Sequence, residues 1–241
     1  MEVRYAEPQE VAPLRELFRL AANCQIVKWA HLSRGFAYPV MIEAAGQQLG
    51  YGVVQTTEPE EMLIEWFSPD PDDSQKVFDA ILEFTTVPLV TYQTNFPFVE
   101  SVLNDHIISK EPGPILFEVG TRTEKSIPDA EFRRKRVDDK IFAHTTEPEG
   151  EWVIEWRGEV VATGGYFTHY NPPFADLYME VAPKFRRMGF GSLMVHELVT
   201  VIEGTGFTPS ARCNPNNLAS AECLQSAGMT VCGQLITARI H

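Results

Sequence analysis

The stretch EVAPKFRRMGFGSLMVHEL, residues 180–198, concentrates groups that could bind an anion. Arg186 and Arg187 offer charge-assisted hydrogen-bond donors. Gly189 and Gly191 lack the Cβ atoms that would keep phosphate oxygens away from the backbone. The apolar spacing after Gly191 predicts a helix, and a helix N-terminus exposes unpaired N–H groups and the positive end of its dipole. The predicted anion site consists of Arg186, Arg187, Met188, Gly189, Phe190, Gly191 and Ser192.

Four named motifs fail at this loop. A dinucleotide fingerprint needs a third glycine where Met194 stands, and a P-loop needs a lysine after Gly191. A zinc-protease motif begins at His196 but has Thr200 in place of its second histidine. The serine-hydrolase motif G-x-S-x-G is absent from the sequence.

The strand predicted before the loop carries the candidate catalytic groups. Tyr178 and Glu180 alternate onto one face of it. We expect Glu180 to act as a general base, directly or through a water, with Asp176 as a second candidate. Tyr178 is the candidate proton donor. The alternatives are an ion pair to an arginine for Glu180 and ordinary packing for Tyr178.

Composition excludes several classes of protein. The 241 residues carry a net charge of −13, which argues against binding to nucleic-acid phosphates and suits cationic or small neutral partners. The four cysteines form no C-x-x-C pair, which is typical of a cytoplasmic protein. The sequence has neither a signal-peptide pattern nor an apolar run of about 18 residues, so no membrane association is expected.

The order of predicted elements occurs twice along the chain. Each half reads as a helical segment, a strand, a turn, a longer strand, a third strand, a helix, a strand and a helix. In the second half the helical segment is FRRKRVDDKIFAHT, residues 132–145. Corresponding elements lie 112 to 120 residues apart, which indicates a duplicated α/β unit with a mixed sheet. The polar stretch 121–129 is the predicted linker, so we expect one domain over residues 1–122 and another over 123–241.

Two motifs in the second half carry a family resemblance. Arg186, Gly189 and Gly191 match the pattern [Q/R]-x-x-G-x-[G/A]. Asn217, followed by a small residue three positions later and a glycine eleven positions later, matches a second pattern. On these residues the segment from Phe132 to His241 resembles the GCN5-related N-acetyltransferase (GNAT) superfamily, and residues 3–120 resemble it only in element order.

The resemblance implies a tandem GNAT fold that uses acetyl-CoA as the acyl donor and needs no metal. The loop would hold the pyrophosphate of coenzyme A, and Asn217 would contribute to the cofactor site. The backbone N–H near Val181 would polarise the thioester carbonyl.

Two departures from the family pattern bear on function. Leu224 stands where many members have the tyrosine that protonates the leaving thiolate. At the corresponding loop of the first half, Asp70, Asp72 and Asp73 would repel a pyrophosphate. The N-terminal domain is therefore expected to be a degenerate copy without the cofactor loop.

The resemblance and the residues together predict a cytoplasmic N-acetyltransferase that moves an acetyl group from acetyl-CoA directly to a primary amine of a small molecule. A non-catalytic acyl-CoA-binding or regulatory module is the alternative that Leu224 favours, and an enzyme that acetylates protein lysines or N-termini is a third. The expected partners are a coenzyme A thioester and the amine, without nucleic acid or membrane. A homodimer is one of the assemblies left open.

Overall fold

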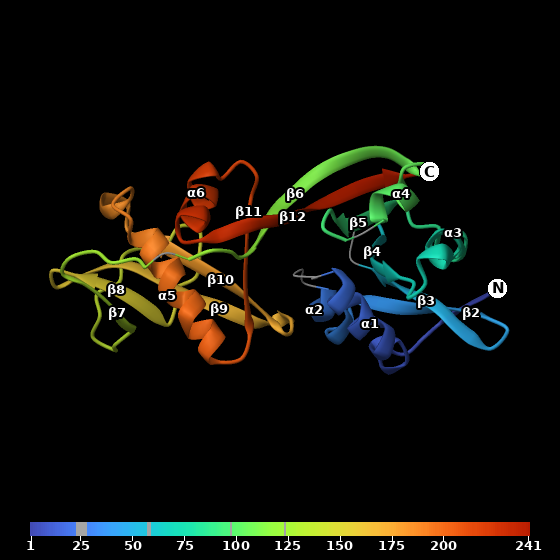
Figure 1. Cartoon of the computed structure of the whole chain (residues 1–241), viewed down its shortest axis with the longest axis horizontal. Coiled ribbons are helices and arrows are strands. Elements are labelled where there is room, and N and C mark those ends of the chain that lie inside the picture. The colour runs from blue at the N-terminus through green and yellow to red at the C-terminus, as the bar shows by residue number, and fades with distance from the viewer. Residues whose placement is uncertain (23–27, 57–58, 97, 123) are drawn as a thin grey trace. The chain divides into compact units, whose positions relative to one another are not determined.

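The computed structural model describes residues 1–22, 28–56, 59–96, 98–122 and 124–241, which fall into two compact units (Figure 1). Unit 1 comprises Met1–Pro114 and Gly233–His241, and unit 2 comprises Ile115–Cys232. Unit 1 is thus discontinuous in sequence and unit 2 is continuous, whereas the sequence suggested a single boundary after residue 122. The assignment of the two halves to a degenerate and a cofactor-binding domain stays a prediction.

Unit 1 is a mixed sheet with strand order β1-β2-β3-β4-β5-β12 and helices on both faces. The strands and helices that begin within this unit are β1 (Glu2–Tyr5), α1 (Pro8–Ala22), α2 (Lys28–Ser33), β2 (Ala37–Ala44), β3 (Gln47–Gln55), β4 (Met62–Phe67), α3 (Ser74–Thr85), β5 (Leu89–Gln93), α4 (Val99–Leu103) and β6 (Ile107–Val119). A short 3₁₀ turn, Pro71–Asp73, precedes α3.

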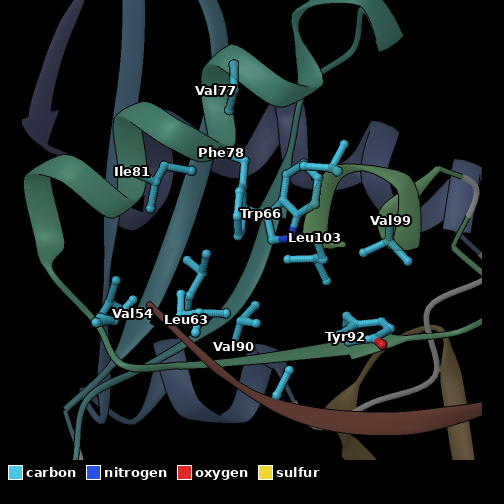
Figure 2. Close-up of a cluster of buried hydrophobic side chains, with 14 of the residues drawn as sticks. Val54, Leu63, Trp66, Val77, Phe78, Ile81, Val90, Tyr92, Val99 and Leu103 are labelled. Carbon is cyan, nitrogen blue, oxygen red and sulfur yellow. The ribbon is translucent and has the colours of Figure 1, made fainter. Parts of the chain in front are cut away.

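The core of unit 1 lies between the sheet and helices α3 and α4. Figure 2 shows Val77, Phe78 and Ile81 of α3 over Leu63 and Trp66 of β4. A second cluster covers the opposite face, where α1 contributes Val11, Leu14 and Phe18.

Unit 2 has strand order β6-β11-β10-β9-β8-β7. Its further elements are β7 (Ala130–Arg134), β8 (Trp152–Trp156), β9 (Glu159–Asn171), β10 (Phe174–Val181), α5 (Phe190–Gly204), β11 (Thr208–Cys213), α6 (Leu218–Ser226) and β12 (Met229–Ile240). Helices α5 and α6 pack on one face of the sheet through Val195, Val199 and Leu224, among others. The opposite face has no covering helix, because the fully described segment between β7 and β8 is irregular.

The last strand of each half completes the sheet of the other half. Residues Leu235–Arg239 of β12 pair with β5 in unit 1. Residues Ile115–Glu118 of β6 pair with β11 in unit 2. Ile236, Ala238 and Ile240 therefore belong to the core of unit 1, although they close the chain. We call this arrangement the strand exchange.

Most predicted elements are confirmed, including the turns at Ala45–Gly46 and Arg157–Gly158, where all four residues have positive φ. The helix predicted over 132–145 is wrong. Its first residues form β7, where Phe132 stacks on Trp152 at 4.8 Å, and Arg133 binds both Asp139 and Glu155. The contacts with Trp152 and Glu155 are long-range, and they outweigh the local helical pattern. Helix α2 and the first half of β6 were not predicted.

Candidate active site

Strands β10 and β11 separate partway along unit 2 and leave backbone groups of β10 unpaired. Their parallel pairing ends at Asp176 and Ser210. On the other side of β10, Ala182 N–H donates to the Val161 carbonyl at 2.9 Å, and Glu180 lies opposite Thr163. Because antiparallel pairs alternate between bonded and non-bonded, the amides of Met179 and Val181 point away from β9, into the gap. These N–H groups could bind a thioester and its amide-containing arm.

The loop after β10 presents a row of free amides. Arg187 and Gly189 have φ of 66° and 89°, so the backbone turns sharply before α5 begins at Phe190. In the described part of the chain, the amides of residues 187–192 donate to no backbone carbonyl, whereas Leu193 N–H bonds the Gly189 carbonyl at 3.0 Å. Ser192 Oγ donates to that same carbonyl and does not cap an amide. A left-handed turn followed by a 15-residue helix is a suitable place for phosphate oxygens.

The two glycines of the loop serve different purposes. A Cβ at Gly189 would meet only Ile127, at 3.6 Å, so this glycine is needed for its positive φ. A Cβ at Gly191 would lie 2.8 Å from Cys223 Sγ and 3.2 Å from Met179 Cε. Gly191 therefore permits the close packing of α5 on α6 and β10. Its role as a site for phosphate approach stays a prediction.

Both arginines of the loop have partners within the chain. Arg186 Nε donates to the Val181 carbonyl at 3.2 Å, and Arg186 Nη2 lies 3.7 Å from Glu180 Oε1. Arg187 pairs with Glu222 of α6 at 3.0 Å, where both side chains are exposed. Arg186 thus braces the end of β10, and an exposed Arg187 can exchange its partner for a bound anion at little cost.

Glu180 is buried and holds the segment that follows β7. Its carboxylate accepts hydrogen bonds of 2.9–3.3 Å from the backbone N–H groups of Thr145, Thr146 and Glu147 and from the two threonine hydroxyls. Burial alone would raise the pKa of Glu180, but these donors outweigh it and lower the pKa to about 2. Such a carboxylate is a weak base, and this geometry favours a positioning role over proton abstraction.

His144 belongs to the same segment and is not free to bind substrate. Its Nδ1 lies 2.9 Å from the Glu147 carbonyl oxygen, and its Nε2 lies 3.0 Å from Thr163 Oγ1. We assign the proton to Nδ1, since a carbonyl can only accept, so Nε2 accepts from the threonine. Nε2 therefore fastens the segment to β9, and Nδ1 stabilises the turn within the segment.

Tyr178 lies on the same face of β10 and keeps its proton. Its ring stacks on Phe167 at 4.7 Å and crosses Gly165, where a Cβ would lie 2.6 Å from the hydroxyl. Burial, and then the charges of Glu151 and Glu147, raise the pKa of Tyr178. No hydrogen bond reaches its hydroxyl among the described residues. A protonated, unpaired phenol is available as a donor.

The other motif residues have local structural roles. Asn217 Oδ1 caps α6 by accepting from Ser220 N–H at 3.1 Å, which explains the three-residue spacing. Gly228 has φ of 93°, and a Cβ there would lie 2.8 Å from the Thr121 carbonyl oxygen. Leu224 is buried in the core under α6. Burial raises the pKa of the neighbouring Cys223 thiol to about 11, with Lys125 opposing weakly, so this thiol stays neutral.

The corresponding gap in unit 1 is filled. Pairing between β4 and β5 ends at Leu63 and Val90, and beyond it Trp66 and Phe96 pack with ring centroids 6.0 Å apart. A cavity of about 10 Å³ remains, enough for roughly one water molecule. Asp70 caps the turn that leads into α3 by accepting from Asp72 N–H. Acidic caps and aromatic filling replace the free amides and open gap of unit 2.

Unit 1 also buries a carboxylate on β4, but there an arginine side chain neutralises the charge. Arg15 of α1 contacts Glu65 at 2.5 and 2.8 Å, and Tyr51 Oη donates to Glu65 Oε1 at 2.6 Å. Both charged side chains are at most 4% exposed. In unit 2 no helix lies on this face, and backbone N–H groups take the place of the guanidinium.

The remaining sequence predictions concern metals, thiols and membranes. Over the residues that the structure describes, no group of three or more histidine, cysteine or acidic side chains could hold a metal ion. Within the same residues, no helix combines the length and apolarity needed to cross a membrane. Cys213 and Cys223 are free thiols, and Cys24 lies outside the described residues.

Comparison with known proteins gives a family match for part of the sequence and a shared fold for the chain. Residues 117–229 match the sequence model of the Acetyltransferase (GNAT) family. No curated protein sequence is significantly similar to the chain. Among solved structures, an acetyltransferase of the GNAT family from Colwellia psychrerythraea superposes with a TM-score of 0.74 and 14% identity, covering 100% of both chains.

Two further structures extend this likeness along the whole chain. A tandem GNAT protein from the clavulanic acid biosynthesis pathway gives a TM-score of 0.61 at 9% identity, covering 99% of this chain and 98% of the other. A GCN5-related N-acetyltransferase from Sphaerobacter thermophilus gives 0.58 at 12%, covering 99% and 95%. The chain has a tandem GNAT fold. Residues 117–229 form a domain of the GNAT acetyltransferase family.

Proposed function

We propose that this protein is an N-acetyltransferase that transfers an acetyl group from acetyl-CoA to a primary amine, and that unit 2 carries the reaction. The observation that carries the proposal is the free amides of residues 187–192 at the start of α5, near the part of β10 that no longer pairs with β11. Backbone donors at a helix N-terminus fit a pyrophosphate. Acetyl-CoA supplies the acyl group as a thioester.

The chain's own groups would position and polarise the reactants. The amides of Met179 and Val181 point into the gap, where they can hold the amide-containing arm and polarise the thioester carbonyl. The amine nitrogen bonds to the carbonyl carbon as the C–S bond breaks, and the nitrogen loses a proton. Tyr178 would donate a proton to the departing thiolate. Because the pKa of Glu180 is about 2, water is favoured as the acceptor of the proton that the amine loses. Glu180 would act on this proton at most indirectly, through the segment that it binds.

The cofactor claim is tested by calorimetry with acetyl-CoA on the wild type and two variants. Gly189→Asp puts a strained residue and a negative charge among the free amides, so binding should weaken at least tenfold. Asp72→Asn alters the corresponding loop of unit 1 and should leave binding unchanged. Equal affinity in wild type and Gly189→Asp would refute the proposed pyrophosphate site.

A non-catalytic acyl-CoA-binding module is the second candidate, favoured by the burial of Leu224 at the usual proton-donor position. The two functions differ in turnover. Release of free thiol from acetyl-CoA in the presence of a panel of primary amines and lysine peptides supports the enzyme. Tight binding of acetyl-CoA without release above the buffer rate supports the binding module.

A further inference from the structure

The segment that Glu180 holds lies on the face of β10 that also carries Tyr178, the proposed proton donor, and we call the segment and this face the wall. Glu180, Tyr178 and Asp176 share the face of β10 opposite helix α5, and Thr163 and Phe167 of β9 lie opposite this set in register. Residues 144–147 reach this face because five donors bind the Glu180 carboxylate. A side chain on this segment is therefore held beside the reacting strand.

The acidic side chains on this wall differ in whether their carboxylates already have hydrogen-bond or ion-pair partners. Glu180 is fully used by its donors, and Asp176 is paired with Arg212 at 2.9 Å. Glu151 lies 3.9 Å from Arg134 on the exposed rim. Among the described residues, no hydrogen bond or ion pair reaches the carboxylate of Glu147, which is exposed. Glu147 is thus the carboxylate that an incoming cation can use without displacing a partner.

Aromatic rings lie on the same face of the sheet as this segment, and the Glu147 charge acts on one of them, Tyr178. Phe167 stacks on Tyr178 and contacts Tyr170 with centroids 5.4 Å apart. A cation already uses one of these faces, because the Arg212 guanidinium lies 5.6 Å from the centroid of Tyr170. A carboxylate and aromatic faces on one side of a sheet together favour the binding of ammonium groups.

We propose that Glu147 binds a non-reacting ammonium group of the acceptor, so that the preferred substrate is a small amine with a second positive charge. This inference rests on the proposed function. The attacking nitrogen must be neutral to form the new bond. A carboxylate stabilises the charged ammonium form, so Glu147 would bind a second nitrogen that does not react. Although the Glu147 side chain is exposed, partial burial of its carboxylate and then the charges of Asp176 and Glu180 raise its pKa, and the charge of Arg212 opposes the rise.

The test compares 1,5-diaminopentane with pentylamine, which differ only in the second amino group. We expect wild-type kcat/KM to favour the diamine about tenfold or more, and Glu147→Gln to remove most of that preference by raising KM for the diamine. Pentylamine should be used equally by both proteins. Glu149→Gln is the matched control, because Glu149 is exposed on the same segment and paired with Lys135.

A binding measurement separates this inference from the proposed function. Diaminopentane is titrated by calorimetry into protein saturated with coenzyme A. Weaker binding to Glu147→Gln than to wild type and Glu149→Gln supports the inference, even where no amine is acetylated and the proposed function fails. If both amines are acetylated and Glu147→Gln leaves the preference between them unchanged, the inference is overturned and the proposed function stands. Failure of wild type to bind the diamine overturns it as well.

Discussion

Thr145 binds the Glu180 carboxylate twice, with its hydroxyl 2.9 Å and its backbone N–H 3.1 Å from Oε1. With Thr146 and Glu147, it surrounds a buried negative charge with donors that water would otherwise supply. The carboxylate therefore belongs to the architecture of the face on which the reaction is proposed to occur. Its removal should alter the protein in a way that depends on pH.

We predict that Glu180→Gln destabilises unit 2 by roughly 2 kcal/mol at pH 7, after allowance for solvent screening. The folded-state pKa of about 2 lies below the ordinary 4.5, so the stabilising contribution is complete above about pH 5. It is lost as the pH falls from 4.5 toward 2. Urea unfolding of both proteins between pH 7 and pH 3 measures the difference, which should shrink on acidification. A difference that is constant with pH would contradict the assigned pKa.

The glycines of the loop should separate into two classes. Gly191→Ala should cost about 1–3 kcal/mol through the clash with Cys223, and adding Cys223→Ala should restore most of it. Gly189→Ala should cost about 1–2 kcal/mol through its positive φ, and Cys223→Ala should not rescue it. Thermal unfolding of the single and double variants provides the measurement. Gly204→Ala is the control, because open space surrounds that position at the end of α5.

Tyr178→Phe tests the proton donor. If the hydroxyl protonates the leaving thiolate, kcat for thiol release should fall about 10–100-fold, with little change in KM for acetyl-CoA. The raised pKa of Tyr178 keeps the donor protonated, so the wild type should retain activity at pH 9. Phe167→Leu removes the stacking partner and leaves the hydroxyl. A loss of kcat equal in both variants would show that packing, and not proton donation, explains the effect.

Deletion of Gly233–His241 should unfold unit 1. The deletion removes the strand that pairs with β5 and takes Ile236, Ala238 and Ile240 from its core. Burial of three such apolar side chains contributes several kcal/mol, at about 1.5–3 kcal/mol for each large one. Hydrogen exchange should show loss of protection in β5, and deletion of His241 alone should not. A folded, protected β5 in the truncated protein would contradict the strand exchange.

Replacing one member of the buried Arg15–Glu65 pair in unit 1 should destabilise the protein more than replacing both. Glu65→Leu leaves the Arg15 guanidinium buried without its carboxylate and should cost about 3–5 kcal/mol. Arg15→Met combined with Glu65→Leu should lie closer to the wild type. Glu60→Gln, which disrupts the exposed pair with Arg239, should cost at most about 1 kcal/mol. Denaturant unfolding compares the variants.

Local sequence patterns predicted the features that depend on local geometry. Positive φ at Gly189 and the cap at Asn217 concern a few consecutive residues, so their types and spacing were enough to indicate a loop before a helix and a second helix start. Hydrophobic periodicity likewise predicted most strands and helices. The acidic replacement of the loop in the first half could also be read directly.

Features set by distant partners could not be predicted. The pattern of residues 132–145 is helical in isolation, but Arg133 finds Asp139 and Glu155 only in the folded sheet. The partner of Gly191 is Cys223, 32 positions away, and the donors to Glu180 come from 33 to 35 positions upstream. The sequence suggested a base at Glu180 because it shows that a carboxylate is present. It does not show the amides that surround this carboxylate in the folded protein.

The strand exchange has a consequence for synthesis on the ribosome. Most of unit 1 precedes unit 2 in the sequence, and domains usually fold in the order in which they emerge. Here β5 must wait for Leu235–Arg239, which emerge after the whole of unit 2. The sheet of unit 1 therefore closes only after unit 2 has emerged, and until then β5 lacks this partner strand. A nascent chain of this protein presents an unfinished edge at β5 while the whole of unit 2 is translated, and a chain truncated before Gly233 would leave that edge permanently open.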